Sequence, residues 1–64
     1  MKAQIWTIEN CSYCIKAKKL MVLKKIEYKE RSGFHPDWKS VPYIEIDGAA
    51  IGGFTELAKF LRNS

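Results

Sequence analysis

The sequence predicts a small α/β protein whose elements follow the order β-α-β-β-β-α and form a four-stranded mixed sheet. Two periodicities carry this prediction. Short segments alternate apolar and polar residues, as half-buried strands do, and two other segments repeat apolar residues every three to four positions, as amphipathic helices do. The length of 64 residues allows one thin hydrophobic core. We therefore expect a single domain over residues 1–64.

The first half of the chain predicts a strand, a helix and a second strand. Residues 3–8 alternate and are rich in β-branched and aromatic side chains, which is typical of a strand. Residues 12–24 carry an apolar stripe at helical spacing, and no glycine marks where this helix ends. Residues 26–31 alternate again. Because the two strands are joined through a helix, they should be parallel.

The second half predicts a β-hairpin followed by a short helix. The Asp-Gly dipeptide at positions 47–48 is a strong hairpin signal, and it lies between candidate strands at residues 41–46 and 49–51. Residues 55–62 then return to helical periodicity. We expect Thr55 to be the N-cap of this closing helix.

A connector of nine residues, 32–40, separates the two halves. Pro36 is expected to open one helical turn within it, since proline suits the first position of a helix. We expect Trp38 to cover the core and His35 to have a structural role.

The charge pattern excludes several classes of function. The net charge is +4, and five lysines fall within ten residues: Lys16, Lys18, Lys19, Lys24 and Lys25. No stacking aromatic motif is interleaved with them, so we interpret the cluster as a solvated helix face and not as a nucleic-acid site. No apolar run approaches the roughly 20 residues that cross a bilayer, and the N-terminus lacks the apolar stretch of a signal peptide. We therefore expect a cytoplasmic protein without membrane or nucleic-acid partners.

The two cysteines, Cys11 and Cys14, form a Cys-x-x-Cys motif between the first strand and the helix. A disulfide that closes so small a loop constrains the unfolded chain little, so the pair is a poor structural staple. Cys11 precedes the first helical turn, where unpaired N–H groups and the helix dipole stabilise a thiolate. Cys14 lies one turn inside, on the side that faces the core. This division predicts an outer nucleophile and an inner resolving thiol.

Other uses of a cysteine pair fit the sequence less well. A structural zinc site needs about four ligands, and only His35 supplements the two cysteines. Covalent haem attachment needs a histidine directly after Cys14, where Ile15 stands. A strand, a Cys-x-x-Cys and a helix in succession are the context of a redox site, so we favour redox chemistry and expect no metal.

Three motifs occur together along the chain. They are Cys11-Ser12-Tyr13-Cys14, Ser40-Val41-Pro42 and Gly52-Gly53-Phe54-Thr55-Glu56-Leu57. In this order the motifs resemble those of the glutaredoxins, especially the small bacterial and phage forms, and the resemblance covers essentially the whole chain. It implies a thioredoxin-like fold. It also implies glutathione-dependent reduction of protein disulfides and of protein–glutathione mixed disulfides, with glutathione as the co-substrate.

The resemblance also implies a role for each matching residue. Cys11 is the nucleophile, Cys14 resolves the mixed disulfide, and Tyr13 flanks the bound glutathione. Val41, ahead of a cis Pro42, offers its backbone N–H and C=O to the cysteine of glutathione. The γ-glutamyl end is held by residues at the start of the last helix, where a helix N-terminus suits a carboxylate. These residues are Gly53, Phe54, Thr55 and Glu56.

The sequence departs from the family pattern in three places. Glu9-Asn10 stand where the family has a basic residue just before the first cysteine, which affects the pKa of the Cys11 thiol and recognition of the glycine carboxylate of glutathione. The connector at residues 32–40 is too short for the helix that the family has there. No helix is expected after residues 55–62.

Two alternatives stay open at this level. A redoxin recharged by thioredoxin reductase is favoured by the missing basic residue and disfavoured by Tyr13 and the Gly-Gly element. A [2Fe–2S] carrier would share a cluster between two chains through Cys11 and bound glutathione, and Ser12 in place of the usual proline resembles cluster-binding members. Without a cluster we expect a monomer. Its partners would be glutathione and disulfide-containing or glutathionylated proteins, and the resemblance implies ribonucleotide reductase as one substrate.

Overall fold

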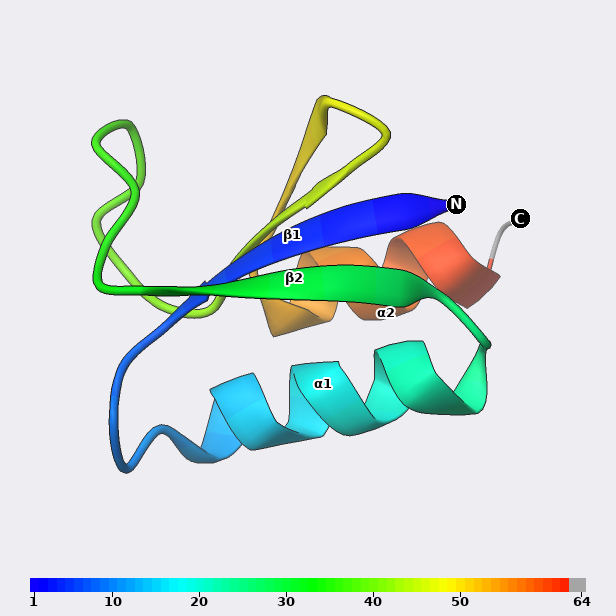
Figure 1. Cartoon of the computed structure of the whole chain (residues 1–64), viewed down its shortest axis with the longest axis horizontal. Coiled ribbons are helices and arrows are strands. Elements are labelled where there is room, and N and C mark those ends of the chain that lie inside the picture. The colour runs from blue at the N-terminus through cyan, green and yellow to red at the C-terminus, as the bar shows by residue number, and fades with distance from the viewer. Residues whose placement is uncertain (63–64) are drawn as a thin grey trace.

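The computed structural model describes residues 1–62, with four strands and two helices in the predicted order (Figure 1). Neither helix in this part of the chain is long and apolar enough to cross a membrane. The elements are β1 (Lys2–Thr7), α1 (Ser12–Leu23), β2 (Glu27–Ser32), β3 (Tyr43–Ile46), β4 (Ala49–Gly52) and α2 (Phe54–Arg62).

The strands form one mixed sheet in the order β2-β1-β3-β4. β1 and β2 are parallel, with Ala3 opposite Tyr28, and β3 runs antiparallel to both β1 and β4. Asp47 and Gly48 form the tight hairpin turn with φ angles of 51° and 84°, in the left-handed region that such a turn requires. The predicted mixed topology is confirmed.

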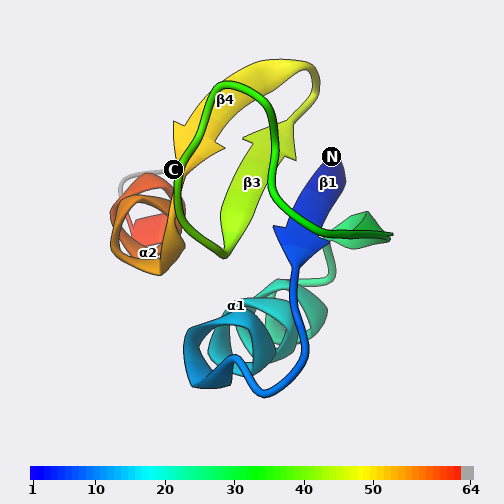
Figure 2. The ribbon, with the colours of Figure 1, turned by 90° about the vertical axis from the view of Figure 1, so that its left-hand side faces the viewer.

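Both helices pack on the same face of the sheet (Figures 1 and 2). Alternate strand residues point to this face, and Ile5 of β1 and Ile44 of β3 are fully buried there against Met21 of α1 and Leu57 of α2. The apolar core is formed by Ala3, Ile5, Ala17, Met21, Ile26, Ile44, Ile46, Leu57 and Leu61. This face therefore supplies most of the hydrophobic stabilisation of the described fold.

The opposite face of the sheet carries the connector between β2 and β3. Trp6 and Tyr43 alternate with the core positions of their strands, so they point to this side. The two rings are in contact with each other, and His35 packs against both, with ring centroids 4.8 Å from Trp6 and 4.5 Å from Tyr43; Trp38 lies 5.5 Å from Tyr43. The backbone N–H of Trp38 donates to the His35 carbonyl at 3.1 Å. This bond closes a single turn around Pro36 without forming a helix. This aromatic cluster (Trp6, His35, Trp38 and Tyr43) anchors the connector to the sheet.

Glu45 adds a polar contact to the aromatic cluster. The Tyr43 hydroxyl donates to Glu45 Oε2 at 3.0 Å, and Nε2 of His35 lies 3.5 Å from the same oxygen. Burial raises the pKa of the Tyr43 phenol, and its hydrogen bond to Glu45 raises it further, so the hydroxyl stays protonated at neutral pH. His35 thus has the structural position expected from the sequence.

The start of α2 differs from the prediction. Thr55 is not the N-cap, because α2 begins at Phe54 and the Gly53 carbonyl accepts the first helical hydrogen bond, from the N–H of Leu57 at 2.9 Å. Glu56 Oε1 in turn accepts from the Gly53 N–H at 2.9 Å. This is one half of a capping box, in which Gly53 holds the N-cap position that was expected for Thr55 and Glu56 is the third helical residue.

The end of α1 is closed by a lysine where glycine is usual. Lys25 adopts a φ of 60° and its N–H donates to the Val22 carbonyl at 3.0 Å, while the Ile26 N–H donates to the Met21 carbonyl at 2.8 Å. These two bonds define a Schellman motif. The helix therefore ends one residue earlier than predicted, and β2 begins one residue later, because Ile26 is engaged in the cap.

β3 begins two residues later than predicted, at Tyr43. The Val41–Pro42 peptide bond before it is cis, as the resemblance implied. Pro42 has no N–H to donate to a neighbouring strand, so regular pairing starts only after it. Elsewhere the strand bounds match the prediction or differ from it by one residue, because the ends of strands are set by pairing partners and not by the alternation itself.

Candidate active site

Cys11 and Cys14 form a disulfide at the N-terminal turn of α1, with their Cα atoms 5.2 Å apart. Cys11 is itself the N-cap of the helix, in an extended conformation, and its Sγ accepts a hydrogen bond from the Cys14 N–H at 3.1 Å. The sulfur thus takes the place that a serine or aspartate oxygen takes in other helices. No acidic residue lies in the first turn of α1. The geometry therefore favours negative charge on Cys11 Sγ once the disulfide is opened.

The two cysteines differ in exposure. Cys11 is half-buried, whereas only 2% of Cys14 is exposed. A thiol or disulfide arriving from solvent therefore reaches the Cys11 sulfur first. Burial disfavours a thiolate at Cys14, so the two thiols are chemically unequal.

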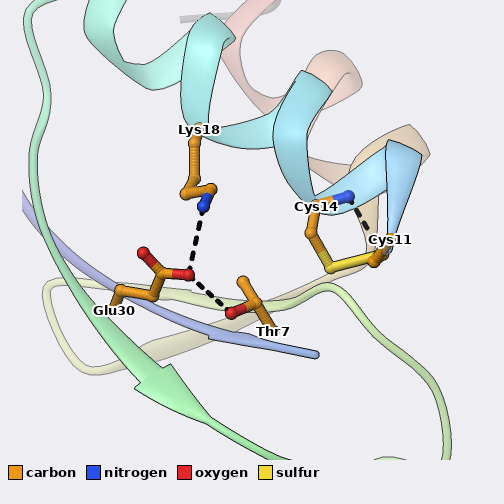
Figure 3. A network of polar contacts seen from close by, with 5 residues as sticks. All are labelled: Thr7, Cys11, Cys14, Lys18 and Glu30. Atoms are coloured by element: carbon orange, nitrogen blue, oxygen red, sulfur yellow. Dashed lines mark hydrogen bonds and ion pairs between the residues drawn. A yellow bond between two sulfur atoms is a disulfide. The ribbon is translucent and has the colours of Figure 1, made fainter. Parts of the chain in front are cut away.

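A polar network lies beside the disulfide (Figure 3). The Thr7 hydroxyl donates to Glu30 Oε2 at 2.7 Å, and the Lys18 ammonium donates to the same oxygen at 3.1 Å. These three side chains line, with both cysteines, a pocket of about 280 Å³ at the ends of β1 and β2. The network joins α1 to both parallel strands at the point where the redox pair is held.

The Glu30 carboxyl is ionised in this network. The hydrogen bond from Thr7 lowers its pKa most, and the hydrogen bond and charge of Lys18 lower it further. Thr7, Lys18 and Glu30 were not expected at the site from the sequence. One local signal was available for Lys18, which lies four positions after Cys14 and so on the same helical face. No local signal places Glu30, because it reaches the site only through strand pairing.

The residues expected to bind glutathione lie together in a second hollow, a groove of about 290 Å³. It runs between the first turn of α1, the Val41–Pro42 peptide and the first turn of α2. The Tyr13 and Phe54 rings, which both line it, are in contact, with centroids 5.9 Å apart. All seven expected residues line the groove: Tyr13, Val41, Pro42, Gly53, Phe54, Thr55 and Glu56. We call this hollow the α2 groove.

Two further residues, Trp38 and Ser40, line the α2 groove. Trp38 packs on Tyr43, on the face of the sheet opposite the core, so it does not cover the core as expected, and its position in the groove was not anticipated. Its indole Nε1 is buried and has no hydrogen-bond partner among the described residues. Of the side chains that line the groove, Glu56 is the one with a formal charge. The groove thus offers backbone donors of a helix start, one carboxylate and aromatic walls.

The described residues offer few ligands for a metal ion or an iron–sulfur cluster. Within residues 1–62 no three His, Cys, Asp or Glu side chains are gathered as a metal-binding group. At the site the chain offers two sulfur atoms, from Cys11 and Cys14. A tetrahedral metal or an iron–sulfur cluster would therefore need ligands from outside this chain.

The fold and the redox pair together define the class of protein. A mixed sheet with two helices on one face and a Cys-x-x-Cys disulfide at the first helix start is the architecture of a thioredoxin-like thiol–disulfide oxidoreductase. Comparison with protein-family models found no match, and comparison with curated protein sequences found none either.

Two solved structures are similar to the chain over nearly its whole length. The chain is similar to the crystal structure of glutaredoxin 1 from Francisella tularensis, which was complexed with cacodylate, with a TM-score of 0.81 and 28% sequence identity over 98% of both chains. It is also similar to the solution structure of glutaredoxin from Brucella melitensis, with a TM-score of 0.82 and 24% identity over 100% of this chain and 82% of that one. The chain therefore has the structure of a glutaredoxin, which confirms the resemblance found in its motifs.

Proposed function

We propose that this protein is a glutathione-dependent oxidoreductase that reduces protein disulfides and protein–glutathione mixed disulfides. One observation carries the proposal: seven residues from three distant parts of the sequence line the α2 groove, next to the helix turn that holds Cys11 and Cys14. The similarity to solved glutaredoxins supports it. Reaction through the cysteine pair requires that a ligand in this groove present its sulfur to Cys11.

Glutathione has chemistry that matches the α2 groove. Its γ-glutamyl end carries a carboxylate and an ammonium group. The carboxylate would accept from the backbone N–H groups at the start of α2, at Phe54 and Thr55, and the ammonium would pair with the Glu56 carboxylate. The backbone of Val41 would pair with the cysteinyl residue in the manner of a short added strand. Tyr13 would cover the bound tripeptide from the side of α1.

The reaction proceeds by two thiol–disulfide exchanges. The Cys11 thiolate attacks one sulfur of the substrate disulfide, a Cys11–substrate disulfide forms, and the other substrate sulfur leaves as a thiolate. Cys14 then loses its proton and attacks Cys11 Sγ, which releases the second substrate thiol and leaves the Cys11–Cys14 disulfide. Two electrons have passed to the substrate. Two glutathione molecules return the pair to its dithiol form and leave as glutathione disulfide.

For a glutathionylated substrate one exchange releases the protein thiol, and a second restores the Cys11 thiol. Cys11 takes the glutathione moiety, the protein thiol leaves, and a second glutathione attacks the Cys11–glutathione disulfide. Cys14 is not needed on this route. The α2 groove would bind the glutathione moiety in both halves of the reaction.

The test is a steady-state assay that offers two electron sources. Reduced glutathione with glutathione reductase and NADPH should support turnover of a glutathionylated substrate, and thioredoxin reductase with NADPH should not. Efficient turnover with thioredoxin reductase and none with glutathione would overturn the proposal in favour of the redoxin alternative. The cytoplasmic address and ribonucleotide reductase as a substrate stay predictions.

A further inference from the structure

α1 and β2 enclose a third hollow that the redox chemistry does not use. We call it the α1 groove; its volume is about 370 Å³ and its lining is Ile15, Lys18, Lys19, Val22, Leu23 and Tyr28. The aliphatic side chains in it face solvent: Ile15 is 49% exposed, Val22 65% and Leu23 76%. Three large apolar residues gathered at one hollow of so small a protein are more than scattered surface residues, and such a patch marks an interaction site.

The α1 groove is continuous with the redox pocket. Ile15 and Lys18 line both hollows, so the groove begins where the pocket of Cys11 and Cys14 ends. From Cys11 to Leu23 the helix rises by about 18 Å. An extended peptide of about six residues spans that distance. A polypeptide whose disulfide is held at Cys11 can therefore lay its neighbouring residues along the groove.

The charge around the α1 groove is positive. α1 contains Lys16, Lys18 and Lys19 and no acidic residue, and Lys24 and Lys25 follow directly. No acidic residue lines the groove in the part of the chain that the structure describes, and Glu30 beside it on β2 is paired with Lys18 at 3.1 Å. Such a surface attracts an acidic chain. A second copy of this protein fits poorly, because its own lysines would face the same lysines across the contact.

We propose that the α1 groove is the docking site for protein substrates, and that it selects acidic segments with aliphatic side chains next to the disulfide to be reduced. The inference rests on the proposed function, because it assigns a substrate class to that same site. The aliphatic side chains of the segment pack on Val22 and Leu23. Its carboxylates pair with Lys19 and with the lysines at the end of α1. Glutathione itself makes no use of this groove.

The test measures a single turnover of prereduced protein with synthetic peptides. Each peptide carries one intramolecular disulfide followed by a tail of about six residues, the length that reaches the end of α1. The tail is acidic and aliphatic, basic and aliphatic, or acidic with serine in place of the aliphatic residues. Two electrons pass from the protein dithiol to the peptide, so no other reductant is needed. Mass spectrometry after acid quenching gives the rate constant.

With the wild-type protein, the acidic aliphatic peptide should react roughly tenfold faster than the basic one, in the range that electrostatic steering gives. The double variant Val22→Gln/Leu23→Gln should lose the preference for aliphatic tails, and Lys19→Glu should lose the preference for acidic tails. The matched controls are Phe60→Gln, an exposed apolar residue on α2, and Lys29→Glu, which makes the same change in net charge on β2 outside the groove. Both controls should keep both preferences.

A small glutathionylated substrate separates this inference from the proposed function. All four variants should turn it over at the wild-type rate. If the wild type fails with this substrate, the proposed function is wrong; if it succeeds and all peptides react alike, only the docking site is wrong. Two other outcomes would also overturn the docking site. One is a concentration-dependent dimer lost in Val22→Gln/Leu23→Gln, and the other is sedimentation with anionic lipid vesicles that depends on the same residues.

Discussion

The two helices pack on one face of the same sheet, yet they use their surfaces differently. α2 buries Leu57 and Leu61 and turns mainly polar side chains outward, with Phe60 37% exposed. α1 buries small or flexible side chains and leaves larger aliphatic ones in solvent, among them Val22 and Leu23. A helix that only supported the fold would resemble α2. The apolar residues that α1 keeps exposed are therefore an argument for a surface with a function.

The first turns of the two helices also differ in the group that the helix end stabilises. At α1 the cap is the sulfur of Cys11, so the group that the helix end stabilises is the reacting group. At α2 the Glu56 carboxylate accepts from the N–H of Gly53, the N-cap residue, and both residues line the α2 groove together with Phe54 and Thr55. One helix end thus serves chemistry, and the other is suited to hold a ligand. Four experiments test the roles of the two helices, from the largest expected effect to the smallest.

The largest effect is expected at the start of α1. Cys11→Ser should abolish reduction of both disulfide and glutathionylated substrates, because an alcohol is not a comparable nucleophile. Cys14→Ser should lose reduction of protein disulfides that need an intramolecular resolving thiol, and keep deglutathionylation. Iodoacetamide alkylation followed against pH in each single variant measures the acidity of the remaining thiol. A more acidic and more reactive Cys14 would reverse the roles assigned to the pair.

The next effect concerns the start of α2. Thr55→Glu places a second carboxylate beside the one expected from the ligand, and it should raise the KM for glutathionylated substrate roughly tenfold to a hundredfold, since a charge-assisted hydrogen bond contributes about 1.5–3 kcal/mol. Thr55→Gln is the control, because it has nearly the same shape without the charge, and it should raise the KM much less. Equal KM values for the two variants would show that the γ-glutamyl carboxylate does not bind beside Thr55.

A smaller effect is expected on stability at the end of α1. Lys25 holds a left-handed φ of 60° that glycine adopts without a steric cost, so Lys25→Gly should raise the free energy of unfolding by about 1 kcal/mol. Lys24 has a φ of −88°, and Lys24→Gly is the matched control that should bring no gain. Urea unfolding of both variants measures the difference. A destabilised Lys25→Gly would show that the lysine side chain itself supports the cap.

The smallest effect concerns the contact between α1 and the sheet. Thr7 and Lys18 lower the pKa of the Glu30 carboxyl in the folded protein. The ionised Glu30 carboxylate therefore stabilises the folded protein above the ordinary pKa of 4.5, and this stabilisation is lost as the pH falls through the lowered pKa. Glu30→Gln should make the free energy of unfolding fall less in this acidic window. Glu27→Gln, at an exposed glutamate of the same strand, is the control, and its free energy of unfolding should depend on pH as that of the wild type does. If Glu30→Gln shows the same pH dependence as the wild type, ionisation of Glu30 does not contribute to stability.

The sequence predicted the elements well because their signals are local. Alternation, helical spacing and the Asp47-Gly48 turn each depend on a few neighbouring residues, and the structure confirms the order and topology that they indicated. The errors lie at the boundaries. Thr55 looked like a cap by residue type, but Glu56 reaches back to Gly53, and which side chain caps a helix depends on backbone geometry.

For the site, the sequence by itself determined the inequality of the two cysteines. One precedes a helix and the other lies a turn inside it, so exposure and helix position follow from their spacing. Only the tertiary structure decided what surrounds them. Packing of the connector and both helix starts brings Tyr13, Val41 and Phe54 into one groove, although they are far apart in the chain. Strand pairing brings Glu30 to the redox pocket. The apolar spacing of α1 did not reveal which of its residues stay exposed, because exposure depends on where the sheet and α2 end and not on helical period.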